Sequence, residues 1–109
     1  MTEAREARLA HNESVFRTVN ESINGIAIAL GGDQPYEFIC ECSTSDCFER
    51  LVLTLAEYEH VRADGAYFLL AAGHEDIEVE LVVETHDAYV IVEKDGVAGL
   101  AAHDADPRA

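Results

Sequence analysis

Apolar residues recur at helical spacing through the first third of the chain. Intervals of three, four or seven positions link them into one seam: Leu9, Phe16, Val19, Ile23, Ile26 and Leu30. This periodicity predicts one long helix over residues 3–30, with Glu13 and Arg17 as an i,i+4 pair on its surface. Gly31-Gly32 supplies a left-handed stop, and Pro35 prevents continuation. We expect the seam to pack on the domain's own sheet; a coiled-coil homodimer through the 3–30 helix is the alternative.

The rest of the chain changes to the shorter periodicity of β-strands. Alternating or short buried apolar runs predict four strands, at residues 36–41, 49–53, 67–71 and 88–94. In the first of them, Tyr36, Phe38 and Cys40 share one face. Thr54 and Glu57 fit a capping box, which predicts that a short helix follows the second strand directly.

Residues 76–84 fit both periods. Ile77, Val79, Leu81 and Val83 alternate as in a strand, whereas Asp76 is a good N-cap. The helical face would contain Val79, Val82, Val83 and His86. A short helix is the favoured interpretation of this segment.

Together these elements predict an α+β fold. A long N-terminal helix is followed by a small, mostly antiparallel sheet of three or four strands, with one or two short helices. Residues 1–95 form a single domain, and residues 96–109, which are mainly small and polar, form a flexible C-terminal tail.

The chain is strongly acidic, and this limits its partners. It has 109 residues and a formal net charge of −15, from 22 acidic and 7 basic residues, and the basic residues are scattered. Binding to nucleic acid or to an anionic membrane surface needs clustered positive charge, so both are excluded as partners. Mimicry of DNA towards a basic protein is a minor alternative, because most such charge simply lies on a solvated surface.

The start of the chain mixes both charge signs and shows no apolar signal-peptide run. The longest apolar stretch, residues 66–72, is too short to span a bilayer. We therefore expect a cytoplasmic location, where thiols stay reduced. The chain also has three cysteines, and a disulfide framework would not explain an odd number.

All three cysteines lie within eight positions, in the pattern Cys40-x-Cys42-x4-Cys47. Turn-forming residues occupy positions 43–46 and bend the chain back, so the three sulfurs can converge. Zinc takes soft sulfur ligands in a tetrahedron, and a closed site needs a fourth ligand. The sequence therefore predicts one zinc ion per chain, against the alternative that Cys40 is an ordinary core cysteine.

His74 is the favoured fourth ligand, because it follows a buried strand and Gly73 lets the backbone come close. His86 is its main rival, and Asp46 is a further alternative that would leave the site more negative. Three thiolates, a neutral imidazole and Zn²⁺ carry a total charge of −1, which backbone amides can offset. His60 stands late in the predicted short helix and is expected to be solvated.

Four short sequence motifs carry a resemblance that covers roughly residues 5–94. They are Cys40-x-Cys42-x4-Cys47, Leu53-Thr54-x-x-Glu57-Tyr58-Glu59-x-Val61-Arg62, Gly73-His74-Glu75 and Val92-Glu93-Lys94. In this the chain resembles a family of small uncharacterised bacterial proteins, in which a Pro-Gly-His segment follows the third strand and a helix often leads. Ala72 departs from that pattern, since it stands at the proline position. The resemblance implies that the cysteines pair with His74, and it implies no activity.

The sequence favours a structural Cys₃His zinc site in a protein-interaction or regulatory module, with a protein partner and no catalytic residue. A thiol-based redox or zinc-responsive switch is the first alternative, because thiolates on zinc remain oxidisable. A small zinc-dependent hydrolase is the second; it would use three cysteines and a water on zinc, with His74 as a base and Glu41 or Glu75 carrying protons. The H-E-x-x-H and G-x-S-x-G motifs and the deaminase signature are all missing from the sequence, which disfavours an enzyme.

Overall fold

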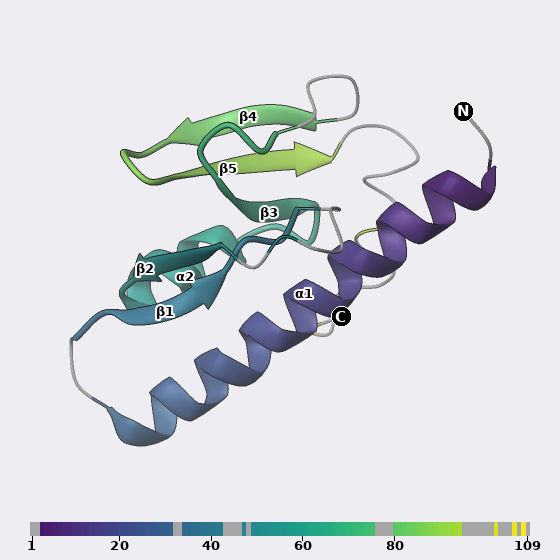
Figure 1. Cartoon of the computed structure of the whole chain (residues 1–109). Coiled ribbons are helices and arrows are strands. Elements are labelled where there is room, and N and C mark those ends of the chain that lie inside the picture. Colours follow the sequence, from purple (N-terminus) through teal and green to yellow (C-terminus); the bar gives the residue numbers. More distant parts are fainter. Residues whose placement is uncertain are drawn as a thin grey trace.

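The computed structural model shows a long helix followed by small sheets (Figure 1). It describes residues 3–31, 34–42, 47, 49–75, 80–94, 102, 106 and 108, with side chains from residue 13 onward. The elements in chain order are α1 (Glu3–Leu30), β1 (Tyr36–Ile39), β2 (Arg50–Leu53), α2 (Leu55–Val61), β3 (Tyr67–Ala71), β4 (Glu80–Thr85) and β5 (Tyr89–Lys94). The predicted α+β class and the long leading helix are confirmed.

The strands form two antiparallel sheets instead of the single sheet expected from the sequence. One contains β1 and β2, with Tyr36 opposite Leu53 and Ile39 opposite Arg50. The other has the strand order β3-β5-β4. In Figure 1 both sheets and α2 lie on the same side of α1.

The prediction of a helix near residues 76–84 is wrong for its described part. Residues 76–79 lie outside the described residues, but Glu80–Thr85 is strand β4, paired with β5. The pairing is interrupted between Val82 and Glu84, where the register shifts. A bulge of this kind breaks strict alternation and brings apolar residues into helix-like spacing, which explains the ambiguity of the sequence.

The side of α1 that is buried against the rest of the domain also differs from the prediction. Phe16 is buried and Ile23 packs on the core, but Val19, Ile26 and Leu30 are 41%, 63% and 70% exposed. The buried positions form a largely polar face: Glu13, Phe16, Arg17, Asn20, Asn24 and Ala27. The expectation that the apolar seam packs on the sheet is therefore wrong for Val19, Ile26 and Leu30.

Polar contacts hold this buried face of α1 in place. Arg17 donates to the carbonyl of Tyr67 at 2.8 Å, and its guanidinium lies 3.8 Å from the centre of the Phe68 ring. Glu13 pairs with Lys94 of β5 and not with Arg17 on the surface, so that predicted pair is wrong. Such partners are distant in sequence and leave no trace in its periodicity. No helix in the described part of the chain is long and apolar enough to cross a lipid bilayer.

Local signals at the helix ends are confirmed. Glu57 N–H donates to the Thr54 hydroxyl at 3.2 Å, and Thr54 N–H donates to the Glu57 carboxylate at 2.8 Å, as a capping box requires. At the end of α1, Gly31 has φ +75° and its N–H donates to Ala27 O. A residue with a side chain adopts that left-handed conformation at a cost, which glycine avoids.

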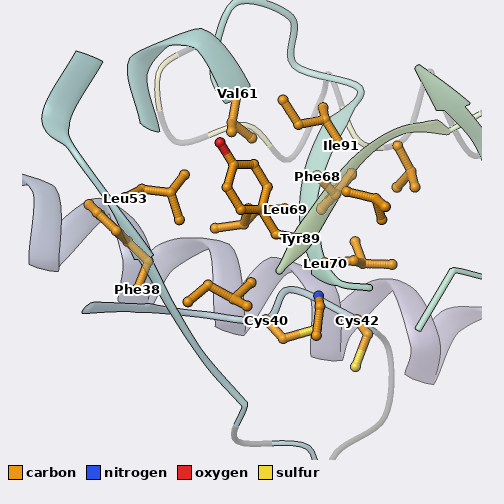
Figure 2. Packing of buried hydrophobic residues seen from close by; sticks show 14 of the residues in the cluster. Phe38, Cys40, Cys42, Leu53, Val61, Phe68, Leu69, Leu70, Tyr89 and Ile91 are labelled. Carbon is orange, nitrogen blue, oxygen red and sulfur yellow. The ribbon is translucent and has the colours of Figure 1, made fainter. Parts of the chain in front are cut away.

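The apolar core lies between the two sheets and α2. Phe38 of β1 stacks on Tyr58 of α2, with ring centres 4.4 Å apart. Figure 2 shows Phe38, Leu53, Leu69 and neighbouring core residues, with the side chains of Cys40 and Cys42 at the border of the cluster.

Most of the predicted flexible tail, residues 96–109, lies outside the described residues. Three of its positions are described, and each contacts the domain. Ala102 is buried, Asp106 pairs with Arg62, and Arg108 pairs with Glu21 and Glu59. At these positions the tail is held and not free.

Candidate metal centre

Two of the three cysteines lie where β1 runs out of the sheet. Cys40 N–H donates to Glu49 O at 2.9 Å, which extends the pairing of β1 with β2 by one step. Cys40 and Cys42 are both buried. They are two residues apart in an extended chain, so their side chains point to the same side.

Glu41, between these two cysteines, anchors the segment to the rest of the domain. Its N–H donates to Leu69 O at 2.7 Å, and its carboxylate accepts from Leu69 N–H at 2.9 Å. The other carboxylate oxygen accepts from the Asn20 amide at 2.8 Å. Asn20 also binds both the N–H and the carbonyl of Ile39, each at 2.8 Å. The ligand-bearing segment is thus tied both to β3 and to α1.

The sequence analysis missed these anchoring roles. Glu41 entered only the hydrolase alternative, as a proton carrier, and Asn20 was not singled out. A signal for Asn20 was nevertheless present, because Arg17, Asn20 and Asn24 recur at helical spacing and mark a polar face.

His74 is delivered by a tight turn at the end of β3. Its N–H donates to Ala71 O at 3.0 Å, and Gly73 adopts φ +91°. Glu75 closes the turn by accepting from Gly73 N–H at 2.8 Å. Ala72 donates its N–H to Ala88 O at 3.2 Å, a bond that proline could not form. The alanine therefore fits this turn.

The structure brings together the four predicted ligand residues: Cys40, Cys42, Cys47 and His74. Their three sulfurs and one ring nitrogen all lie within 4.8 Å of one another. The Nδ1 atom of His74 is 3.6 Å from Cys40 Sγ and 3.5 Å from Cys47 Sγ. Segments far apart in the sequence thus converge on one point.

These distances fit a tetrahedral metal better than thiol hydrogen bonds. A zinc ion with bonds of about 2.3 Å to sulfur and about 2.05 Å to nitrogen sets its S···N separations at about 3.6 Å. In the tautomer that leaves Nδ1 unprotonated, this atom has one lone pair, which accepts a hydrogen bond from one thiol but not from two. Cys40 and Cys47 are nevertheless almost equally distant from it. A common centre between the three atoms accounts for both distances.

The protein environment supports a thiolate at Cys40 only when a compensating charge is present. Its hydrogen bond with Cys42 and its burial both raise the pKa of the Cys40 thiol. Burial also raises the pKa of Cys47. Ala71 N–H donates to Cys40 Sγ at 3.2 Å, which offsets part of a thiolate's charge. A divalent cation would supply the remaining compensation and release the thiol protons.

Among the described residues, neither His86 nor His60 joins the cluster. The ring of His86 stacks on Tyr89, with centres 4.3 Å apart, and its Nε2 lies 2.5 Å from Glu84. His60 lies 2.6 Å from the same carboxylate, away from the cysteines, and is exposed as expected. Asp46 lies outside the described residues.

Comparison with known proteins adds no relative: no family model, no curated protein and no solved structure matches the chain. The resemblance to a bacterial family stays a prediction. The geometry of its own residues defines this chain as an α+β protein with a Cys₃His cluster that could hold a metal ion.

Proposed function

We propose that the chain binds one Zn²⁺ through Cys40, Cys42, Cys47 and His74, and that the ion is structural. The observation that carries this proposal is the convergence of three sulfurs and Nδ1 of His74 within 4.8 Å, with two of the sulfurs almost equally distant from Nδ1. Three soft sulfurs and one imidazole form a donor set typical of zinc. Bound there, the ion would join the segment after β1 to the turn after β3.

Two observations favour a structural role over hydrolysis. The four protein ligands fill a tetrahedron, so they leave no position for a water. The nearby acids are also already engaged, since Glu41 binds Leu69 and Asn20, and Glu75 binds Gly73. Neither carboxylate is held ready to move a proton at the cluster.

The stapled domain then serves as a protein-interaction or regulatory module inside the cell. Its charge of −15 supports a protein partner, since that charge repels nucleic acid and anionic lipid. The metal's contribution in this role is to hold a surface in shape and not to turn over substrate.

Metal content and thermal stability test the staple directly. The intact chain, purified without chelator, should contain one zinc per chain by elemental analysis, and replacement by Co²⁺ should give the visible bands of a tetrahedral thiolate site. Chelation should lower the melting temperature by on the order of 10 °C, because structural zinc binding is coupled to folding.

His74→Ala should abolish stoichiometric zinc and the cobalt bands, and Cys47→Ser should weaken both. His60→Ala is the matched control, because it removes an exposed histidine that is not in the cluster. A zinc-free protein whose melting curve is unchanged by chelator and by His74→Ala would refute the proposal.

A redox-responsive switch is the second candidate, favoured by unequal exposure within the cluster. Cys47 is half-buried and His74 is exposed, whereas Cys40 and Cys42 are buried. A peroxide can therefore approach from the Cys47 side. Two thiolates would reduce one hydrogen peroxide: one S–S bond forms, the O–O bond breaks, and two protons complete two waters as the metal is released.

Zinc release measured with a chromogenic chelator separates the two roles. Release within minutes at low peroxide, reversed by a thiol reductant, supports the switch. Retention of zinc under the same exposure supports the structural role alone.

A further inference from the structure

The outward side of α1 carries an uncharged strip in a strongly acidic protein. We define the strip as Val15, Thr18, Val19, Ser22, Gly25, Ile26 and Ala29. All seven residues are exposed. With 27% of the chain charged, two charged residues would be expected among seven positions, yet the strip has none. Figure 1 shows this helix at the edge of the molecule, with both sheets and α2 on its other side.

The strip is a continuous face of one helix. Measured from Ser22, its members stand three, four and seven residues away in both directions, the spacings that share one side of a helix. The Thr18 hydroxyl already donates to Ser14 O at 2.9 Å within the helix. The Thr18 hydroxyl therefore needs no hydrogen bond from a second protein chain.

The strip is complementary to itself when a second helix runs in the opposite direction. In an antiparallel pair with its two-fold axis at Ser22, residues equidistant from Ser22 lie at the same level. Val15 then faces Ala29, Val19 faces Gly25, and Ile26 faces Thr18. Each larger side chain meets a smaller one, and Ser22 meets its own copy. Small residues at such positions let two helices approach closely and pack tightly.

We infer that α1 forms an antiparallel, two-fold homodimer through this strip, with a second copy of the chain as its occupant. A two-fold interface uses the same patch on both subunits, which this large-to-small pattern satisfies. A neutral strip also lets two chains of charge −15 meet without placing like charges in the contact. This inference does not depend on the metal, because no cluster residue lies on α1.

The size of the strip sets the expected affinity. From Val15 to Ala29 the helix rises about 21 Å, and a contact about 10 Å wide along it belongs to the small interface class below about 1,200 Å². We therefore expect a reversible dimer with a Kd in the micromolar range or weaker. Repulsion between the acidic bodies opposes association, so added salt should tighten the dimer.

Sedimentation velocity of the full-length, zinc-loaded chain over roughly 1 µM to 1 mM tests the inference. Ile26→Glu should weaken the dimer by more than about tenfold, because each copy would bury a charge at the contact. Ile28→Glu is the matched control: Ile28 is 58% exposed, close to the 63% of Ile26, but its spacing places it off the strip. It should leave the dimer within about twofold of wild type.

Charge pairing then tests the direction of the helices. Thr18→Lys alone should weaken the dimer, whereas Thr18→Lys combined with Ile26→Glu should restore it to within about tenfold, because the two positions face each other across the axis. Within one helix they are about 12 Å apart along the axis and do not pair.

A chain that stays monomeric throughout, or equal effects of Ile26→Glu and Ile28→Glu, would overturn the inference. A dimer that the double variant fails to restore would overturn the antiparallel arrangement. Because zinc loading is measured separately by elemental analysis, failure of the dimer and failure of the metal proposal are distinguishable.

Discussion

Replacing Glu41 by Gln removes one oxygen from the best-anchored residue of the metal centre. Glu41 is fully buried, and each of its carboxylate oxygens accepts a hydrogen bond, one from Leu69 N–H and one from the Asn20 amide. Asn20 cannot reverse its amide group without cost, because its oxygen accepts from Ile39 N–H and its nitrogen donates to Ile39 O. The Gln amide nitrogen must therefore face another donor in either orientation.

The expected cost follows from that conflict. One buried hydrogen bond to a charged acceptor is lost and one N–H is left without a partner, which together destabilise the fold by about 2–4 kcal/mol. For a chain of this length the melting temperature should fall by roughly 10–20 °C. The residue also positions Cys40 and Cys42, so zinc affinity should drop by about 10- to 100-fold.

Chemical denaturation, thermal melting and competition with a chromogenic chelator measure these effects. Glu37→Gln is the control: its side chain is 61% exposed and faces Arg50 at the surface, so its cost should stay within about 0.5 kcal/mol. In the variant that combines Asn20→Ala with Glu41→Gln, the facing donor is gone, and the total loss should be about 1 kcal/mol smaller than the sum. If Glu41→Gln melts within about 2 °C of wild type, the anchoring role is refuted.

Further substitutions test other parts of the fold. Gly25→Ala should raise the free energy of unfolding of the dilute chain by about 0.5–1 kcal/mol, and its melting temperature with it, because an added Cβ meets no described atom within 4 Å and glycine disfavours helix. An unchanged or lower melting temperature contradicts this. Thr54→Ala should cost about 1 kcal/mol by denaturant titration through loss of the cap, and a neutral result would show that α2 does not need it. Arg108→Ala should cost about 0.5–1 kcal/mol at pH 7. Hydrogen bonds from Arg108 lower the pKa of Glu59. Burial alone would raise the pKa of Glu21, but hydrogen bonds from Arg108 and the charges of Arg62 and Arg108 lower it below its ordinary value. The stabilisation is therefore complete above pH 4.5, the ordinary pKa of glutamate, and is lost as the pH falls through the lower pKa values of the folded state. Thermal melts of Arg108→Ala and wild type should accordingly converge towards acid, and a constant difference would contradict the assignment.

Local sequence signals predicted the parts of this fold that depend on neighbours in the chain. The capping box at Thr54, the left-handed end of α1 at Gly31 and the alternation around Phe38 all involve residues a few positions apart. Cys40 and His74 could also be predicted to meet, because the ends of two strands carried residue types that share one chemistry.

Contacts between distant residues account for what the sequence did not predict. Periodicity assumes that the buried face of a helix is apolar, whereas α1 buries Arg17, Asn20 and Asn24 against partners in other elements. The acceptors of these side chains include backbone carbonyls, which exist at every position and leave no mark in the sequence. In β4, the register shift between Val82 and Glu84 similarly gave a strand helix-like spacing of its apolar residues.

The two sides of α1 have different roles. The inner side contacts the segment that carries Cys40 and Cys42, and the outer side carries the uncharged strip. On the inner side directional bonds replace hydrophobic burial, and Asn20 fixes the helix to Ile39 and Glu41 in a single register. Hydrogen bonds of this kind specify position strongly while adding only about 1 kcal/mol each in net stability. The apolar side chains of Val19 and Ile26 add little to the monomer, because they stay exposed. Their burial by a second copy would stabilise α1 from its outer side, while Asn20 keeps the inner side in register with Ile39 and Glu41.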